Sequence, residues 1–354
     1  MIRRKWKMNA WNLDQITRRQ VEPILEQGCV INGCIPKDDY AAEVFEELES
    51  TSVAFGTLWE SGDMPVLKMD DTFRQWRKEQ IEACKALVAE RITCLLPWQV
   101  LSHISADQKR SSRLYFSQGG LGSCMGHADS FAHHSTTLCW IARGAPLVYT
   151  PFNPVVTWSI TKGGSIRGGQ TVSEMAKGAN IIGHFPEQLV GTNNQAVPSY
   201  KEHLEAAKDY QSAIMFLNYK GKELADEIIQ CCAAGLSVAL GNSAAVSGCT
   251  IDSNGVKVAV LRGSWAHATH FTAYRVVRGM EYIGWVNSHG ERYKSSDEGE
   301  PADMCWMSRS LVEQFVTTAP AYGSPYVILP ESVTKPDVSH YVKTRIPFPV
   351  NWRF

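Results

Sequence analysis

One short segment of the chain combines the residue types that a reactive thiol needs. Gln118 stands six positions before Cys124, and Gly119, Gly120 and Gly122 lie between them. Glycines permit a tight turn, and the residues after the cysteine can begin a helix. A helix N-terminus or a nearby imidazolium keeps a thiol ionised, and the thiolate is the nucleophile. The segment therefore predicts a nucleophilic Cys124 with a lowered pKa, whose own N–H would hold an oxyanion together with the Gln118 amide.

Two later segments supply a base and a residue that can orient it. His267 and His270 lie in one stretch of apolar and β-branched residues, and Asn287 ends the next such stretch. An imidazole can take the thiol proton and return it to the leaving group, while an amide holds the ring in one orientation. A cysteine among apolar residues is more often a packing residue, so the catalytic interpretation of Cys124 depends on these partners.

The order and spacing of these residues resemble the papain-like cysteine peptidases. In that family the base histidine is followed by alanine, an apolar strand, a hairpin, a second strand that begins with tyrosine, and the motif Asn-Ser-Trp-Gly. The matching residues here are His267, Ala268, Tyr274, the turn Arg278–Glu281, Tyr282 and Asn287–Gly290. The resemblance implies Cys124 as nucleophile, His267 as base, Asn287 as its orienting residue and Gln118 as oxyanion donor. His270 is the alternative base, and on the family spacing it is an inward-facing strand residue.

The resemblance extends over roughly residues 113 to 315. Gly168 and Gly169, which precede a helical segment from Thr171 to Lys177, resemble the part of the family that lines the substrate cleft. Lys222–Gly235 and the apolar residues that follow resemble its later helix and the first strand of its β-rich half. The implied fold is α+β with two lobes, one helical and one β-rich, and an extra, mainly helical N-terminal region. The implied substrate is a polypeptide.

Two residues depart from the family pattern. Met125 stands where many members have tryptophan, and His289 replaces the tryptophan that shields the pair formed by the histidine and the asparagine. We expect this second change to let water compete for that hydrogen bond and to slow turnover. The cysteine segment looks closer to the divergent bacterial and phage-borne branches of the family.

A second interpretation keeps the fold without peptidase activity. The chain would then be a structural or assembly component, for instance of a phage virion, with its cleft vestigial or used only for binding. The long N-terminal region and His289 favour this alternative. Fold alone does not decide between the two.

The composition is that of an ordinary globular protein. Of the 354 residues, 44% are apolar and 20% are charged, and the formal net charge is −1. This charge gives no global attraction to nucleic acid or to an anionic membrane, so neither is an expected partner. The basic start of the chain is not followed by the apolar core of a secretion signal, and no run is apolar enough to cross a bilayer. We expect a cytoplasmic or virion-associated chain that needs no cofactor.

The cysteines allow disulfides or a metal site. There are ten of them, and without a secretion signal we expect reduced thiols, because disulfides persist mainly in oxidising compartments. Cys29 and Cys34 flank a turn-like segment, but no second pair with ligand spacing accompanies them. We therefore expect no metal site.

The motifs divide the chain into four parts. We expect an N-terminal arm or divergent pro-segment (1–112), a helical lobe with the nucleophile (113–245), a β-rich lobe with the histidine and asparagine (246–325), and an extended tail (326–354). Within the first part, apolar residues at helical spacing predict an amphipathic helix from Asp71 to Leu96. Such a helix must bury its apolar face, so we expect it to pack on the body of the protein or on a protein partner.

Overall fold

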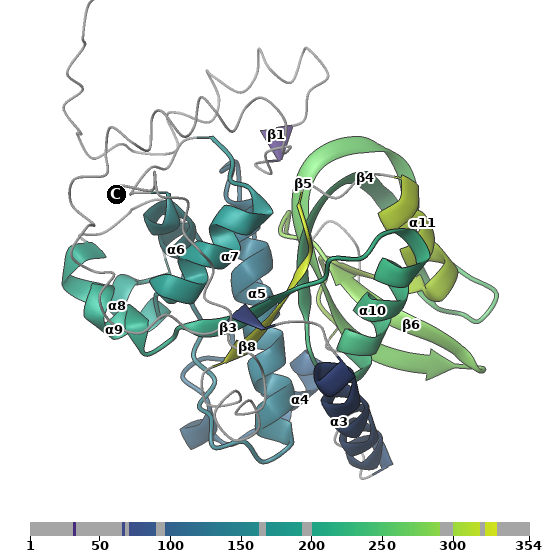
Figure 1. Cartoon of the computed structure of the whole chain (residues 1–354), viewed down its shortest axis with the longest axis horizontal. Coiled ribbons are helices and arrows are strands. Elements are labelled where there is room, and N and C mark those ends of the chain that lie inside the picture. Colours follow the sequence, from purple (N-terminus) through teal and green to yellow (C-terminus); the bar gives the residue numbers. More distant parts are fainter. Residues whose placement is uncertain are drawn as a thin grey trace, which may run out of the picture.

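A helical half and a β-rich half lie side by side in the computed structural model (Figure 1). The model describes residues 31–32, 66–67, 71–89, 96–162, 168–192, 200–290, 300–318 and 323–330. The predicted α+β fold with a helical and a β-rich lobe is confirmed. Most of the predicted N-terminal arm and the tail beyond Pro330 lie outside the described residues.

One buried helix forms the centre of the helical half. Helix α5 (Cys124–Ala142) has no exposed side chain from Cys124 to Cys139. A helix that is buried all round needs neighbours on every side. Here they are the helices α4 (Pro97–His103), α6 (Pro154–Thr161) and α7 (Val172–Ile181) and the strands of the other half. The short helices α8 (Glu187–Val190) and α9 (Leu204–Lys208) lie farther out (Figure 1).

Local sequence signals explain where these helices begin. Asn153 accepts hydrogen bonds from the N–H groups of Val155 and Val156, both at 3.1 Å, and Pro154 occupies the first turn of α6. Thr171 and Glu174 form a reciprocal capping box at the start of α7. The helix expected after Gly168 and Gly169 is therefore confirmed.

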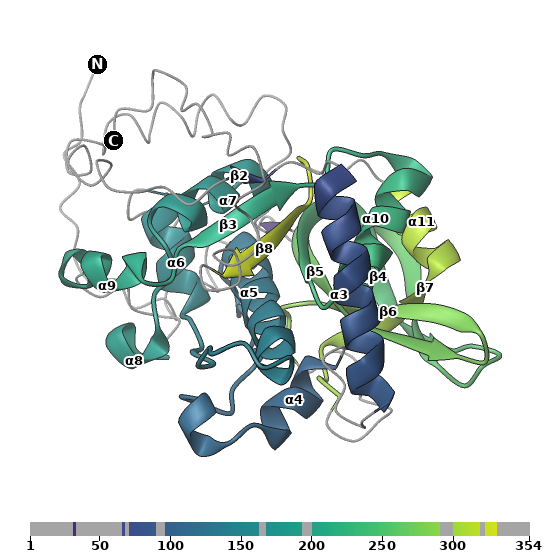
Figure 2. The same cartoon turned by 60° about the horizontal axis from the view of Figure 1, so that its bottom comes forward.

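Long antiparallel strands build the β-rich half. The sheet runs in the order β2-β3-β8-β4-β5-β6-β7, and β1 pairs with β5. The strands are β1 (Ile31–Asn32), β2 (Val66–Leu67), β3 (Ser212–Phe216), β4 (Val238–Ile251), β5 (Lys257–Val277), β6 (Met280–Val286), β7 (Met304–Ser308) and β8 (Tyr326–Pro330). The sheet curls so that β7 also pairs with β5, through Val258 and Trp306. Helices α10 (Gly221–Ala233) and α11 (Arg309–Thr318) pack together beside it (Figure 2).

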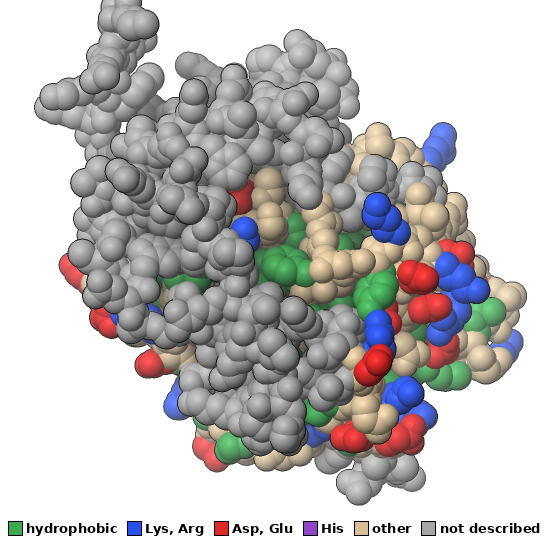
Figure 3. All heavy atoms as spheres, viewed as in Figure 1, with side chains coloured by type: hydrophobic (Ala, Val, Ile, Leu, Met, Phe, Trp, Pro, Cys, Tyr) green, Lys and Arg blue, Asp and Glu red, His purple; other side chains and the backbone are tan. Residues whose placement is uncertain are grey.

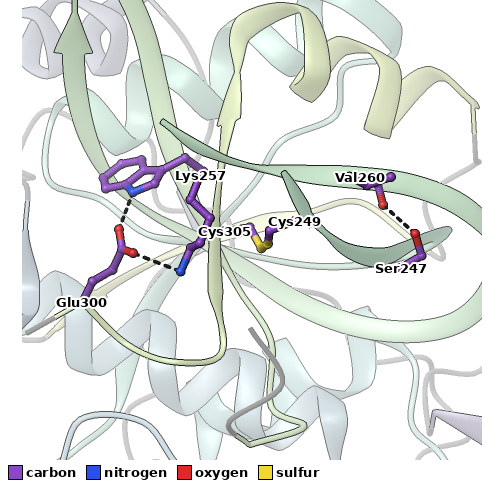
Figure 4. The surroundings of a disulfide bond; sticks show 7 residues. Ser247, Cys249, Lys257, Val260, Glu300 and Cys305 are labelled. Atoms are coloured by element: carbon purple, nitrogen blue, oxygen red, sulfur yellow. Dashed lines mark hydrogen bonds and ion pairs between the residues drawn. A yellow bond between two sulfur atoms is a disulfide. The ribbon is translucent and has the colours of Figure 1, made fainter. Parts of the chain in front are cut away.

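A disulfide ties two strands of the curled sheet. Cys249 on β4 and Cys305 on β7 are bonded, with their Cα atoms 6.4 Å apart (Figure 4). Next to it, Lys257 Nζ lies 3.0 Å from the Glu300 carboxylate, which also accepts a hydrogen bond from the Trp306 indole. The expectation of reduced thiols is therefore wrong for this pair, because the curl of the sheet brings together two cysteines 56 positions apart.

The amphipathic helix of the N-terminal region is docked on the body. Helix α3 (Asp71–Ala89) lies along α10 (Figure 2). Trp76 stacks on Trp140 near the end of α5, with ring centroids 5.8 Å apart, and Arg77 pairs with Glu227 on α10. The predicted helix is confirmed over Asp71–Ala89, and of its described apolar side chains Cys84 is buried and Trp76 and Ile81 are half-buried. Residues 90–95 lie outside the described part.

Charged side chains of both signs are mixed on the visible face of the β-rich half (Figure 3). Arg309, at the start of α11, pairs with Glu281 at 2.8 Å and also with Asp226. In the part of the chain that the structure describes, no helix is both long enough and apolar enough to cross a bilayer.

Candidate active site

Cys124 is the first residue of α5, as predicted. The turn before it places Gly119 at φ +61°, which glycine adopts without strain. The Cys124 sulfur accepts a hydrogen bond from the backbone N–H of Ala268, the residue that follows His267 on β5. The thiol from the helical half therefore touches the strand that carries the predicted base.

Burial controls the ionisation of this thiol. Cys124 is 0% exposed, and burial raises the pKa of its thiol to about 12. Backbone hydrogen bonds from Ala268, Met125 and Cys124 itself act in the opposite direction but are weaker. The prediction of a lowered pKa is therefore wrong for this buried thiol. The loss of hydration raises its pKa more than the N–H groups at the helix N-terminus lower it.

His267 and Asn287 form a buried pair. Strands β5 and β6 are antiparallel neighbours, and their register sets His270 opposite Val286, the last residue of β6. Asn287 therefore follows β6 close to His267. The His267 Nε2 atom lies 2.6 Å from Asn287 Oδ1, and the two residues are 0% and 1% exposed. The expectation that His289 opens this pair to water is therefore wrong.

Hydrogen bonds identify the protonated nitrogen of His267. The backbone N–H of Ser288 donates to Asn287 Oδ1 at 2.8 Å, so this atom is the amide oxygen. An amide oxygen never donates a hydrogen bond, so Asn287 Oδ1 must accept from His267 too. His267 Nε2 therefore carries a proton. In the neutral ring this leaves Nδ1 of His267 as the atom that can take a proton.

His270 has a different environment. Both of its ring nitrogens are buried without a hydrogen-bond partner among the described residues. Its ring centroid lies 5.4 Å from that of Tyr115 and 5.8 Å from that of Phe131, and burial lowers its pKa to about 3. An imidazole with no orienting partner is poorly placed to act as a base, so the geometry favours His267.

Gln118 is held by the loop after β6. Its backbone N–H donates to Ser288 O at 2.7 Å, and the Ser288 hydroxyl donates to Gln118 Oε1 at 2.5 Å. Gln118 Nε2 donates one of its hydrogens to Leu121 O at 2.7 Å. The second hydrogen has no partner among the described residues and can serve an oxyanion. Sequence reasoning gave Ser288 no role, although its place between Asn287 and His289 was the available signal.

The two glycines of the expected cleft wall precede α7. Gly168 has φ +67°, and its carbonyl oxygen accepts a hydrogen bond from Lys162 Nζ at 3.3 Å. Val172 at the start of α7 belongs to the same buried cluster as Cys124. The glycine segment is thus attached to a helix that packs beside Cys124. Residues 163–167, between Lys162 and Gly168, lie outside the described part.

The histidines of α5 are core residues. The His134 Nδ1–H donates to Leu114 O at 3.2 Å, and His134 Nε2 accepts from the N–H of Phe152 at 2.8 Å. The His127 Nδ1–H donates to Ser123 O at 2.9 Å. Burial lowers the pKa of His127 to about 4 and that of His134 to about 3. Among the described residues, no group of three or more histidines, cysteines and carboxylates could hold a metal ion.

A short strand from the N-terminal region lies beside His267. In β1, Ile31 pairs with Ala266 and Asn32 pairs with His267, in a parallel arrangement. The backbone of β5 next to the site is therefore already paired with β1.

A cavity of about 270 Å³ opens elsewhere, in the helical half. His133, nine positions after Cys124 on α5, lines it with Arg110 and Tyr210. None of the predicted site residues lines this cavity.

Comparisons with known proteins found similarity in structure only. No family model matches the chain, and no curated protein sequence matches it. Xylellain, a cysteine protease from Xylella fastidiosa, is 15% identical, with 65% of this chain and 88% of that chain covered and a TM-score of 0.43. Digestive procathepsin L 3 of Tenebrio molitor larval midgut is 12% identical, with 81% and 98% covered and a TM-score of 0.42. The procathepsin B S9 from Trypanosoma congolense is 9% identical, with 81% and 89% covered and a TM-score of 0.43.

Proposed function

We propose that the chain is a papain-like cysteine peptidase that cleaves peptide bonds through an acyl-enzyme on Cys124. The observation that carries this proposal is the buried His267–Asn287 pair, whose histidine lies on the strand whose Ala268 N–H contacts the Cys124 sulfur. The chemistry that fits a thiol, an oriented imidazole and an amide donor is acyl transfer.

The geometry supports a role for each residue in the first half of the reaction. His267 Nδ1 takes the proton of the Cys124 thiol, and the sulfur attacks the carbonyl carbon of the substrate. The negative charge that forms on the carbonyl oxygen is stabilised by the free Nε2–H of Gln118 and by the Cys124 N–H. The C–N bond then breaks, and His267 returns its proton to the leaving amine.

In the second half, water releases the acyl group. His267 removes a proton from the water, the resulting nucleophile attacks the thioester, and the carboxylic acid leaves while the thiol recovers its proton. Throughout both steps Asn287 keeps Nε2–H of His267 in place. A resting thiol with a pKa of about 12 is neutral, so proton transfer must accompany the attack or follow substrate binding.

A polypeptide substrate would lie against Gly168 and Gly169. Residues without side chains let a substrate backbone approach closely. β1 lies beside His267, so we expect it to move away when a substrate binds near Cys124.

The test is covalent labelling by an epoxide or fluoromethyl-ketone peptide probe, mapped by mass spectrometry, together with hydrolysis of a mixed peptide library. We expect labelling at Cys124 in the wild type, none at this position in Cys124→Ser, and much less labelling of the buried thiol Cys139 than of Cys124. If Cys124 is not labelled even after the N-terminal region is removed, the alternative of a structural or assembly component is the correct one.

A further inference from the structure

His289 contacts both members of the buried pair. Asn287 Nδ2 lies 3.2 Å from His289 Nδ1, and the His289 ring stacks on the His267 ring with centroids 4.4 Å apart and an angle of 27°. Trp265 meets both rings edge-on, at 4.8 Å and 5.9 Å. His289 is thus in contact with the side chain that orients the base and with the base itself.

The first contact defines the state of the His289 ring. A primary amide nitrogen only donates hydrogen bonds. The Ser288 N–H fixes the orientation of the Asn287 amide, so the atom facing His289 is the nitrogen. His289 Nδ1 must therefore be a bare acceptor, and the ring must carry its proton on Nε2.

The second contact covers a face of the base. The half-buried ring of His289 lies over His267, which has no exposed surface. A flat ring is sufficient for this cover, but only a ring with a bare nitrogen can also accept from Asn287. Phenylalanine in this position would retain the cover and lose the acceptor.

We propose that His289 is a positioning residue that holds the Asn287 amide, and through it the His267 ring, in the orientation that acylation needs. This inference rests on the proposed peptidase function. Asn287 Oδ1 receives hydrogen bonds from Ser288 N–H and from His267, and Nδ2 is held by His289. With both ends of the amide fixed, rotation about the side-chain bond would break several hydrogen bonds at once.

The first experiment compares His289→Phe with the wild type in the rate of Cys124 labelling by the peptide probe. We expect the rate to fall about threefold to tenfold, the usual range for one lost hydrogen bond, with little change in probe affinity. In an Asn287→Ala background the same substitution should change nothing, because the amide through which it acts is gone. An undiminished rate in His289→Phe, or an equal loss in both backgrounds, would overturn the proposal.

A second experiment does not depend on activity. In the full chain with ¹⁵N-labelled histidine, two-bond ¹H–¹⁵N correlation spectra should show His289 neutral with its proton on Nε2, and the signal is assigned by its loss in His289→Phe. A proton on Nδ1 would refute the positioning role. If the tautomer is as expected but Cys124 is never labelled, the proposed peptidase function fails while the contact between His289 and Asn287 stands.

Discussion

Ser288 and Gln118 bond to each other twice across 170 positions of the chain. The backbone N–H of Gln118 donates to Ser288 O, and the Ser288 hydroxyl donates to Gln118 Oε1. One partner comes from the turn before α5 and the other from the loop after β6. Gln118, the proposed oxyanion donor of the helical half, is therefore oriented by the half that carries the proposed base.

These two hydrogen bonds make Ser288→Ala a test of how Gln118 is held. Loss of the hydroxyl frees the Gln118 amide to rotate, so we expect the acylation rate to fall about threefold to tenfold. Gln118→Ala removes the donor itself and should cost about a hundredfold to a thousandfold. Single-turnover kinetics measure both effects. The role would be refuted if Ser288→Ala lowered the rate as much in a Gln118→Ala background as in the wild type.

Substitutions of the two histidines of β5 should have different effects on acylation of Cys124. His267→Ala removes the base and should abolish Cys124 acylation at neutral pH. His270→Phe should keep acylation near the wild-type rate and raise stability by about 1–3 kcal/mol, because it removes two buried ring nitrogens that lack partners. Probe labelling and urea unfolding measure the two quantities. A loss of labelling in His270→Phe would transfer the role of base to His270.

Stability should fall in mild acid because histidines are buried in the neutral form. Burial lowers the pKa of four of them from 6.5: to about 4 for His127, to about 3 for His134 and His270, and well below 6.5 for His133. Between pH 6.5 and these values the unfolded chain binds protons that the folded protein does not. The free energy of unfolding must therefore decrease as the pH falls through this window, by up to about 1.4 kcal/mol per pH unit for each ring.

Urea unfolding at a series of pH values from 7 to 4 measures this slope. His270→Phe removes one of the four rings and should make the slope shallower. Equal slopes in wild type and His270→Phe would contradict the buried neutral state of His270.

The N-terminal region should limit access to the site. Asn32 in β1 pairs with His267, and Cys124 has no exposed surface. We expect a chain that begins at Asp71, with α3 retained, to be labelled at Cys124 at least about tenfold faster than the full chain. Loss of about 1.4 kcal/mol of pairing between β1 and β5 corresponds to that factor. Rate measurements on the two chains test this.

A separate prediction concerns processing of the N-terminal region. We expect the docked helix α3 to stay attached in the mature protein, because Trp76 and Arg77 anchor it on α5 and α10. Intact-mass measurement decides, and a mature form that begins near Ser111 or Ser112 would show that the region is a pro-segment.

Much of the local structure was predictable from the sequence. The helix that begins at Cys124, the capped helix after Gly169 and the hairpin at Gly279 follow from turn glycines, capping residues and apolar periodicity, which act over a few positions. The pairing of His267 with Asn287 was expected from the resemblance to a family, and the geometry agrees with it.

Other features depend on residues far apart in the chain, and only the tertiary structure decided them. The sequence by itself determined that Cys124 starts a helix, but the packing of β5 against α5 buries the thiol and reverses the expected direction of its pKa. The curl of the sheet brings Cys249 to Cys305, and the end of β6 sets His289 over His267. Desolvation and such contacts arise from the whole surroundings of a side chain, which local patterns do not encode.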